Sequence, residues 1–328
     1  MRLCGKEVRE CPPGLSSNPF ACKKAVVRIN PDLPVSHQLL PGGVMALIMD
    51  GNAVSKAVLA TIAKNMEGLP SGGPRPGLAV VLVGDDPASA IYVGRKKKAC
   101  ESLGYYSEEH RLPAQTSEAE LLALIDSLNT NPKVHGILVQ LPLPKPLNPQ
   151  KTIEAIDPEK DVDGMHPFSL GKLVAGLPGP RSCTPAGVMV LLEHYQLPVA
   201  GKRAVVIGRS IMVGKPMAQL LVEANATVTI CHSKTENIGE VIKTADLIVA
   251  AIGKPKFVKA DMVKEGAVVV DVGINRTPEG KLVGDVDFEA VAPKASAITP
   301  VPGGVGPMTI ALLMRNTFDA FLQQSKNR

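Results

Sequence analysis

The sequence contains no tryptophan, and aromatic residues make up only 3% of its 328 positions although 45% are hydrophobic. Val, Ile, Leu and Ala must therefore build the core, and the length suggests about two domains. No apolar run reaches the ~18 residues of a membrane span, so no membrane partner is expected. None of the six cysteines forms a Cys-x-x-Cys pair or joins a His at zinc-like spacing. These absences predict no metal site and a reducing, cytoplasmic location.

The net charge of the chain is also small, because 31 Asp and Glu nearly balance 36 Lys and Arg. Residues 1–44 hold six basic and three acidic residues, which leaves a net charge of only +2 on the rest of the chain. A nucleic-acid-binding surface needs clustered basic charge. The densest basic run is Arg95–Lys98, which is typical of a solvated helix face, so no nucleic-acid partner is expected.

Residues 1–44 contain six prolines and no periodic apolar pattern. They lack the apolar core of about 7–15 residues that a secretory signal needs. Glu7, Glu10 and Asp32 are atypical of a transit peptide. We predict a disordered leader or an over-long start, with Met45 as the natural beginning of the patterned chain.

From residue 45 onward, helix-like stretches alternate with short apolar stretches. Near-continuous apolar strands between helices predict a parallel sheet that is covered on both faces. The first set comprises helices at 52–66, 87–103 and 117–128, and strands at 78–83 and 136–140. A second set resembles a dinucleotide-binding half, with strands at 203–207, 226–230, 247–251 and 267–271 and a helix at 215–224. The predicted fold class is α/β with two lobes.

Six of the eleven residues in Thr299–Thr309 are Gly or Pro. Such a segment cannot form a helix interior or a central strand, so it must be a shaped loop, where binding sites often lie. Pro307 suits the first position of an apolar helix that follows. The exposed N–H groups at such a helix start favour polar or anionic ligands.

Gly208–Gly214 directly follows a predicted strand and precedes a predicted helix, as does the loop that binds the pyrophosphate in a Rossmann lobe. Its spacing is Gly-x5-Gly rather than Gly-x-Gly-x-x-Gly, and a tight turn that needs glycines is the alternative. The next strand ends without the carboxylate that usually binds the ribose of NAD. Arg209, Ser233 and Lys234 could surround an extra phosphate instead, which favours NADP.

Ser89, Tyr92, Lys96 and Cys100 share one face of the predicted helix at 87–103, because they are spaced by three, four and four residues. A surface lysine beside an aromatic residue is the common alternative. A partly buried Lys96 would have a lowered pKa and could act as a general acid or base. Gln140, at the end of a neighbouring strand, could accept a hydrogen bond from this lysine or donate one to it.

Asp161 and Asp163 alternate in a short segment before Gly164. Without a third clustered carboxylate or histidine, a metal site is disfavoured. One aspartate is expected to bind a ligand through its carboxylate, and the other to cap local structure. His166 is expected to make ordinary polar contacts.

These features together resemble bifunctional methylenetetrahydrofolate dehydrogenase/methenyltetrahydrofolate cyclohydrolase, from about Met45 to the C-terminus. Residues 1–44 have no counterpart in this family. The resemblance rests on ordered motifs at 83–89 (with Tyr92 and Lys96), 136–144, 157–164, 183–187, 208–216, 271–275, 284–287 and 299–309.

The resemblance implies a catalytic folate-binding lobe of residues 45–165 plus 300–328 and an NADP-binding Rossmann lobe of residues 166–299. It also implies that the terminal helix packs back on the first lobe, which the pattern alone leaves open. The implied enzyme oxidises 5,10-methylenetetrahydrofolate with NADP+ and hydrolyses the methenyl product to 10-formyltetrahydrofolate. Such an enzyme serves one-carbon metabolism and purine biosynthesis, binds tetrahydrofolate derivatives and is usually a homodimer.

Residue roles follow from the same resemblance. Lys96 would be the general acid and base, tuned by Gln140 and positioned by Tyr92, which stacks on the folate. Asp163 would hold the pterin edge. The remaining implied contacts are Ser89, Pro302, Gly303 and Gly306 for the substrate, and Gly208, Arg209, Ser210, Gly214, Ser233 and Ile274 for the cofactor.

Two alternatives remain open from the residues. A shikimate-type dehydrogenase shares the two-lobe layout and an active-site lysine, but would not account for Thr299–Thr309. A non-catalytic dinucleotide sensor would have no need of the set Tyr92, Lys96, Gln140 and Asp163.

Overall fold

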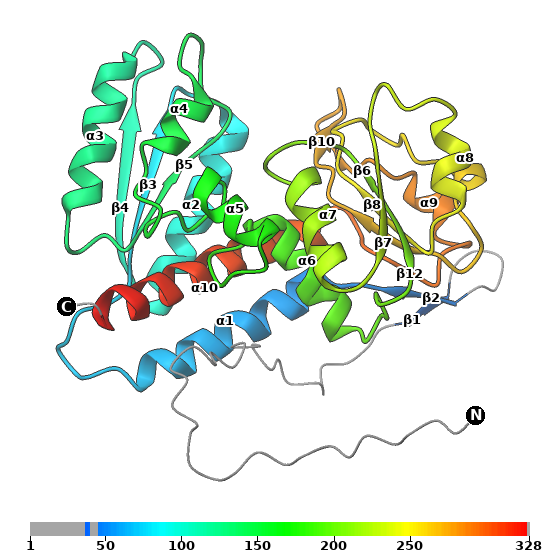
Figure 1. Ribbon diagram of the computed structural model, residues 1–328, viewed down its shortest axis with the longest axis horizontal. Helices are drawn as coiled ribbons and strands as arrows, with labels where there is room; N and C mark the ends of the chain where they lie inside the picture. The colour runs from blue at the N-terminus through cyan, green and yellow to red at the C-terminus, as the bar shows by residue number, and fades with distance from the viewer. Residues whose placement is uncertain (1–36, 40–44, 327–328) are drawn as a thin grey trace, which may run out of the picture.

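The computed structural model describes residues 37–39 and 45–326, which form two α/β lobes crossed by two long helices (Figure 1). The first lobe is built on a parallel three-stranded sheet in the order β4-β3-β5. Strand β3 (Gly77–Val83) is buried along its whole length between β4 (Tyr106–Leu112) and β5 (Gly136–Val139). Sequence reasoning missed β4, because this edge strand is half-exposed and rich in charged residues.

The helices of the first lobe begin where the sequence places their caps. Helix α2 (Pro87–Leu103) starts after Asp86, whose carboxylate accepts from the Ser89 N–H. Helix α3 (Glu118–Thr130) starts with a capping box, in which Ser117 and Glu120 bond each other's backbone N–H groups. The short helices α4 (Pro149–Glu154) and α5 (Pro167–Val174) lead toward the second lobe.

The second lobe contains a seven-stranded sheet in the order β1-β2-β12-β9-β8-β6-β7. From β6 the chain adds β7 on one side and then β8 and β9 on the other, so the strand order reverses at β6, as in a dinucleotide-binding fold. The strands are parallel except for β1, which pairs antiparallel with β2. Their bounds are β1 His37–Leu39, β2 Met45–Ile48, β6 Arg203–Ile207, β7 Thr227–Cys231, β8 Leu247–Ala250, β9 Val268–Asp271 and β12 Ala297–Ile298.

Helices and a small hairpin complete this lobe. Helix α6 (Cys183–His194) and helix α7 (Gly214–Glu223) pack against each other, and α7 also lies on β6 and β7. The other elements are α8 (Ile238–Lys243), η1 (Ala260–Met262), α9 (Phe288–Val291) and the hairpin of β10 (Asn275–Arg276) with β11 (Leu282–Val283).

Two details of the predicted lobes differ from the structure. Residues 45–48 were assigned to the first lobe, but as β2 they pair with β12 in the sheet of the second lobe. Within the predicted leader, His37–Leu39 form β1 on the other side of β2. The rest of that prediction, for residues 1–36 and 40–44, lies outside the described residues.

Helix α1 (Gly51–Glu67) and helix α10 (Val305–Lys326) run side by side beneath the first lobe (Figure 1). The prediction that the terminal helix packs back on the first lobe is confirmed. Its Met314 carbonyl accepts from the Tyr105 hydroxyl at 3.1 Å, and Gln324 donates to the His135 carbonyl at 2.9 Å. Helix α10 also packs on α6, so it joins the two lobes.

The Gly- and Pro-rich segment approaches the start of α1 closely. A Cβ atom on Gly51 would lie 1.7 Å from the Gly304 carbonyl oxygen, so only glycine fits there. Pro307 is not the first helical residue, because α10 begins two residues earlier at Val305. Proline is tolerated at this third position because the first four N–H groups of a helix have no partner within the helix.

Candidate active site

A cavity of about 340 Å³ lies between the two lobes and is lined by both. One side comes from α2, the end of β5 and the Asp163 loop, and the other from the segments after β6 and β9, with α6 and α10 between them. Its lining includes the predicted residues Tyr92, Lys96, Gln140, Asp163, Ile274 and Gly306. The structure thus collects residues that are up to 214 positions apart in the chain.

Lys96 is buried in the middle of α2, with 6% of its surface exposed, although its neighbours Lys97 and Lys98 are exposed. Its ammonium donates to Gln140 Oε1 at 2.8 Å. Burial lowers the pKa of Lys96, and the charge of Asp163 offsets part of this effect. A buried amine with a lowered pKa can exchange protons near neutral pH.

Gln140 holds the lysine with a neutral group. Its amide Nε2 donates to the Leu141 carbonyl at 2.7 Å, which fixes the orientation of the side chain and turns Oε1 toward Lys96. The sequence left two possibilities for this amide, and the structure shows it as the acceptor. A carboxylate in its place would stabilise the ammonium form instead.

Asp161 and Asp163 lie in different environments, and the structure shows the structural role that was predicted for one of them. Asp161 is 3% exposed and accepts from the backbone N–H groups of Met165 and His166 at 3.2 and 2.9 Å. Asp163 faces the cavity, where burial raises its pKa and the nearby Lys96 partly lowers it again. The first aspartate therefore shapes the loop and leaves the second available to a ligand.

His166 makes an ordinary polar contact, as expected: its Nδ1 accepts from the Phe168 N–H at 3.0 Å at the start of α5.

Tyr92 lies one turn before Lys96 and also lines the cavity. Its ring is half-buried, and the Arg95 guanidinium carbon lies 6.0 Å from the ring centroid. Burial raises the pKa of Tyr92, so the hydroxyl stays protonated near neutral pH. Ser89 is buried on the same helix face but does not line the cavity, where Ala88 lies instead.

The Gly- and Pro-rich segment contributes mainly its second half to the cavity. Val305, Gly306 and Thr309 line it. Pro302 and Gly303, which the sequence predicted to contact substrate, are outside the lining and lie near the start of α1. The Gly303 carbonyl accepts from the Asn52 N–H at 3.2 Å, and Gly303 has a φ of 106°, which favours glycine.

The predicted cofactor loop follows β6. Gly208 has a φ of 126°, and a Cβ atom on Gly214 would lie 2.2 Å from the Gly208 carbonyl oxygen, so the turn requires both glycines. The Ser210 hydroxyl oxygen accepts from the N–H groups of Val213 and Gly214 at 3.1 and 3.3 Å. Ser210 therefore caps the start of α7 with its side chain.

Arg209 and Ser233 are both exposed and follow the neighbouring parallel strands β6 and β7. Ligands of such folds bind beyond the carboxyl ends of the strands, so these side chains stand where a bound dinucleotide would lie. The turn after β7 is ordered by His232, whose Nδ1 accepts from the Lys234 N–H at 3.2 Å. The glycine turn, the helix start and these exposed polar groups fit a phosphate-bearing cofactor.

Several cavity residues were not singled out from the sequence. Cys183 is 1% exposed, and burial raises the pKa of its thiol. Thr184 and Thr309 share a hydrogen bond of 3.0 Å between their hydroxyl oxygens, which joins α6 to α10. Only the Cys183–Gly187 motif marked this position in the sequence, and the partner of Thr184 lies 125 residues away.

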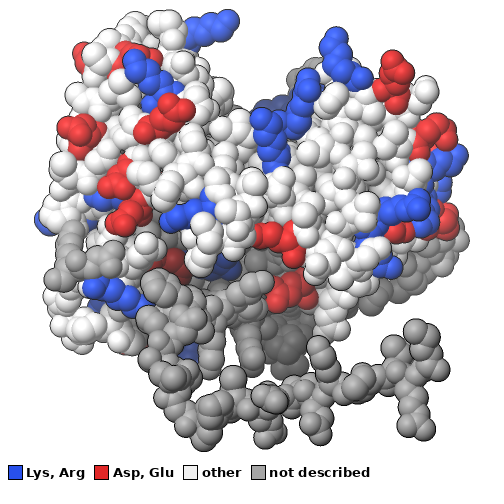
Figure 2. Space-filling model, viewed as in Figure 1, with Lys and Arg blue, Asp and Glu red and all other residues white. Residues whose placement is uncertain are grey.

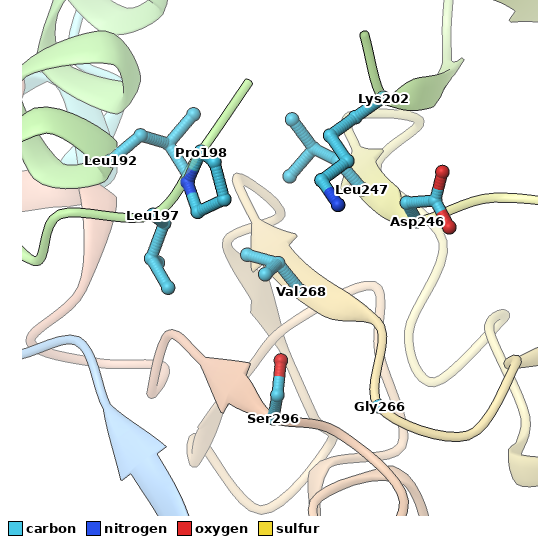
Figure 3. A pocket seen from close by; sticks show the side chains of 9 residues that line it. All are labelled: Leu192, Leu197, Pro198, Lys202, Asp246, Leu247, Gly266, Val268 and Ser296. Carbon is cyan, nitrogen blue, oxygen red and sulfur yellow. The ribbon is translucent and has the colours of Figure 1, made fainter. Parts of the chain in front are cut away.

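A second, smaller hollow of about 180 Å³ lies at the opposite edge of the large sheet, where β6, β8, β9 and β12 begin. Figure 3 shows Lys202 and Asp246 on one side of it, next to Leu247, and Leu192, Leu197 and Pro198 on the other side. None of the residues predicted to bind substrate or cofactor lines this hollow.

The surface carries mixed charge. On the face in Figure 2, basic and acidic side chains alternate, and the molecule is hollowed between its lobes with basic side chains on one rim. Of the helices in residues 45–326, none combines the length and hydropathy that a membrane span requires. Over the described residues, no three His, Cys, Asp or Glu side chains form a set that could hold a metal ion.

A Rossmann-type lobe facing a buried lysine across a shared cavity defines a dinucleotide-dependent two-lobe enzyme. Two family models match the chain: the catalytic domain of tetrahydrofolate dehydrogenase/cyclohydrolase over residues 49–163, and its NAD(P)-binding domain over residues 182–325. The chain belongs to this tetrahydrofolate dehydrogenase/cyclohydrolase family, as its motifs predicted.

Individual relatives are similar over nearly their whole length. "Bifunctional protein FolD" of Campylobacter curvus is 59% identical over 280 residues, which cover 85% of this chain and 97% of the relative. The FolD crystal structure from Campylobacter jejuni has a TM-score of 0.83 at 50% identity, covering 84% of this chain and 99% of that one. The Trypanosoma brucei FolD structure, a complex with NADP and an inhibitor, has a TM-score of 0.82 at 36% identity, with 85% and 98% covered.

Proposed function

We propose that the protein oxidises 5,10-methylenetetrahydrofolate with NADP+ and hydrolyses the resulting 5,10-methenyltetrahydrofolate to 10-formyltetrahydrofolate. The observation that carries this proposal is Lys96, buried and bonded to Gln140, in a cavity that both lobes line. Membership of the family supports it and disfavours the shikimate-type alternative. A non-catalytic sensor is disfavoured because it would not need a buried amine with a lowered pKa.

The first step needs mainly orientation. NADP+, when bound, supplies the acceptor for the hydride that leaves the one-carbon bridge with its electron pair. The turn of Gly208 and Gly214 and the start of α7 would hold its diphosphate, while Arg209 and Ser233 would bind the additional phosphate. Ile274, 46% exposed on the second-lobe side of the cavity, would separate the reacting rings from water.

The second step needs proton transfer. A water molecule adds to the bridge carbon, the bond from that carbon to N5 of the folate breaks, one proton goes to N5 and one is released. Lys96 as a free amine would take a proton from the water and, as an ammonium, give a proton to N5. Gln140 keeps the amine in place and stabilises its charge less than a carboxylate would. Asp163 would bind the pterin edge, and Tyr92 would stack on the ring.

An absorbance assay tests both steps together. The purified protein is mixed with methylenetetrahydrofolate and either NADP+ or NAD+, and the methenyl band is followed as it forms and decays. We expect formation with NADP+ and enzyme-dependent decay. A protein that forms no methenyl product, or that does not accelerate its decay, would contradict the proposal.

We further propose a cytoplasmic homodimer that associates through the cofactor lobe. The described cysteines Cys100, Cys183 and Cys231 are free and buried, which fits a reducing compartment. In the described part of the large sheet, β7 is an outer strand that exposes Ile230 by 40%, and an uncovered edge strand of this kind favours pairing. Light scattering should give twice the chain mass, and Ile230→Lys should shift the protein toward monomer.

A further inference from the structure

Asp285 is a fully buried carboxylate that accepts four hydrogen bonds. Its Oδ2 accepts from the backbone N–H groups of Ile252 and Gly253 at 2.7 and 3.0 Å. Its Oδ1 accepts from the Lys254 N–H at 2.8 Å and from the Asn275 side-chain amide at 3.0 Å. Residues 252–254 follow β8, and Asn275 follows β9, so one carboxylate ties together the segments after two neighbouring strands.

Asp271, at the end of β9, forms a second layer behind this carboxylate. Its Oδ1 accepts from the N–H groups of Gly273 and Asp285 at 2.9 Å each, and its Oδ2 accepts from the Val286 N–H at 2.9 Å. A Cβ atom on Gly273 would lie 2.3 Å from the Asp285 side chain, so the close packing depends on that glycine. The two aspartates and the Asp285 backbone therefore form one connected unit.

Burying these two carboxylates costs free energy that buried apolar residues would not cost. Asp271 is 3% exposed and Asp285 0%, and neither forms an ion pair with a basic side chain in the described residues. Burial raises the pKa of Asp271 to about 6 even though three N–H groups bond it. A carboxylate accepts at both oxygens, whereas an asparagine would turn an N–H group toward one set of N–H donors. The donor pattern therefore calls for aspartate at position 285.

The segments that Asp285 holds form the cofactor side of the cavity. Val272 and Ile274 line the cavity opposite Tyr92 and Lys96. The segments after β8 and β9 lie at the carboxyl edge of the sheet, where dinucleotides bind in such folds. By contrast, the groups proposed for the hydrolytic step are anchored on the first lobe, through the hydrogen bond between Lys96 and Gln140.

We propose that Asp285, supported by Asp271, is a positioning residue for hydride transfer, which fixes the segments after β8 and β9 so that they hold the cofactor at the cavity. The inference rests on the proposed function and predicts that the two activities respond differently to its loss. The measured quantity is the kcat/KM of the dehydrogenase for NADP+, divided by the kcat/KM of methenyltetrahydrofolate hydrolysis. A general loss of folded protein lowers both activities together and leaves this ratio unchanged.

Asp285→Asn should lower this ratio at least fivefold, with a raised KM for NADP+ and little change in hydrolysis. Asp246→Asn is the matched control in the same sheet. Asp246 accepts the Arg203 N–H at 3.0 Å, but it lies at the opposite edge of the sheet, beside the hollow in Figure 3. The control variant should keep the wild-type ratio.

A fall of less than fivefold in Asp285→Asn, or an equal fall in Asp246→Asn, would overturn the inference. If Asp285→Asn does not fold, Asn275→Ala is the second variant, because it removes only one of the four hydrogen bonds to Asp285. It should lower the ratio at least threefold, and a smaller fall would overturn the inference. Wild-type protein without NADP+-dependent oxidation would sink the proposed function itself. An active wild type with an unaffected ratio in these variants would sink only the positioning role.

Discussion

Replacing Lys96 by methionine separates proton transfer from binding. Methionine is unbranched and flexible, so it can fill the buried path of the lysine stem. General acid and base catalysis contributes about 10²- to 10⁴-fold, which corresponds to about 3–5 kcal/mol of barrier height. We expect hydrolysis of methenyltetrahydrofolate to fall by at least about 100-fold in Lys96→Met, while folate affinity changes less than about fivefold.

The structure also bounds the effect of this change on stability. The substitution removes the 2.8 Å bond to Gln140 and leaves an amide oxygen that lines the cavity, where water can reach it. It also removes a buried amine whose charged form is disfavoured, as its lowered pKa indicates. These effects oppose each other, so the free energy of unfolding should change by no more than about 1–2 kcal/mol.

The assay is the decay of the methenyl absorbance, with urea unfolding and folate titration in parallel. Lys97→Met is the control, since Lys97 is 53% exposed and its nearest carboxylate, Glu109, is 3.8 Å away. A surface pair of this kind contributes about 0–1 kcal/mol, so the control should keep wild-type hydrolysis. Hydrolysis by folded Lys96→Met within tenfold of wild type would refute the assignment of Lys96 as general acid and base.

Three further predictions follow from neighbouring contacts. Gln140→Glu places a carboxylate beside Lys96 and should raise the pKa of that amine, so the kcat/KM of hydrolysis should rise toward saturation at a higher pH than in the wild type; an unshifted pH profile would contradict this. Arg209→Ala should raise KM for NADP+ by about 10- to 100-fold while leaving the weaker use of NAD+ unchanged, as steady-state kinetics can check. Gly51→Ala forces a Cβ atom into a backbone carbonyl and should destabilise the fold by at least about 2 kcal/mol in urea unfolding. At Gly94 a Cβ atom would meet no side chain and no other segment within 4 Å, so Gly94→Ala should not destabilise the fold.

Local signals predicted much of the fold. The N-cap Asp86 and the following proline place the start of α2, and its predicted bounds agree with the observed Pro87–Leu103. The apolar β3 and β5 were identified because buried parallel strands read as continuous apolar stretches. Strand β4 was missed because its edge position leaves it half-exposed and polar.

The candidate site was predicted only in part. Spacing along one helix grouped Tyr92 with Lys96, and the structure keeps both at the cavity. The same spacing grouped Ser89 with them, but the cavity is lined by the neighbouring Ala88 instead. The role of Asp285 was not visible, because its hydrogen-bond partners at 252–254 lie more than thirty residues away in the sequence.

The sequence by itself determined the family, the alternation of strands and helices and the residue types capable of the chemistry, because caps, periodicity and motifs are local. Only the tertiary structure decided which of these residues meet. Burial lowers the pKa of Lys96, and the charge of Asp163 offsets part of this effect. Asp163 and the hydrogen-bond partner Gln140 both come from other segments of the chain. The pairing of residues 45–48 with β12 and the hydrogen bonds to Asp285 likewise depend on segments that folding alone brings together.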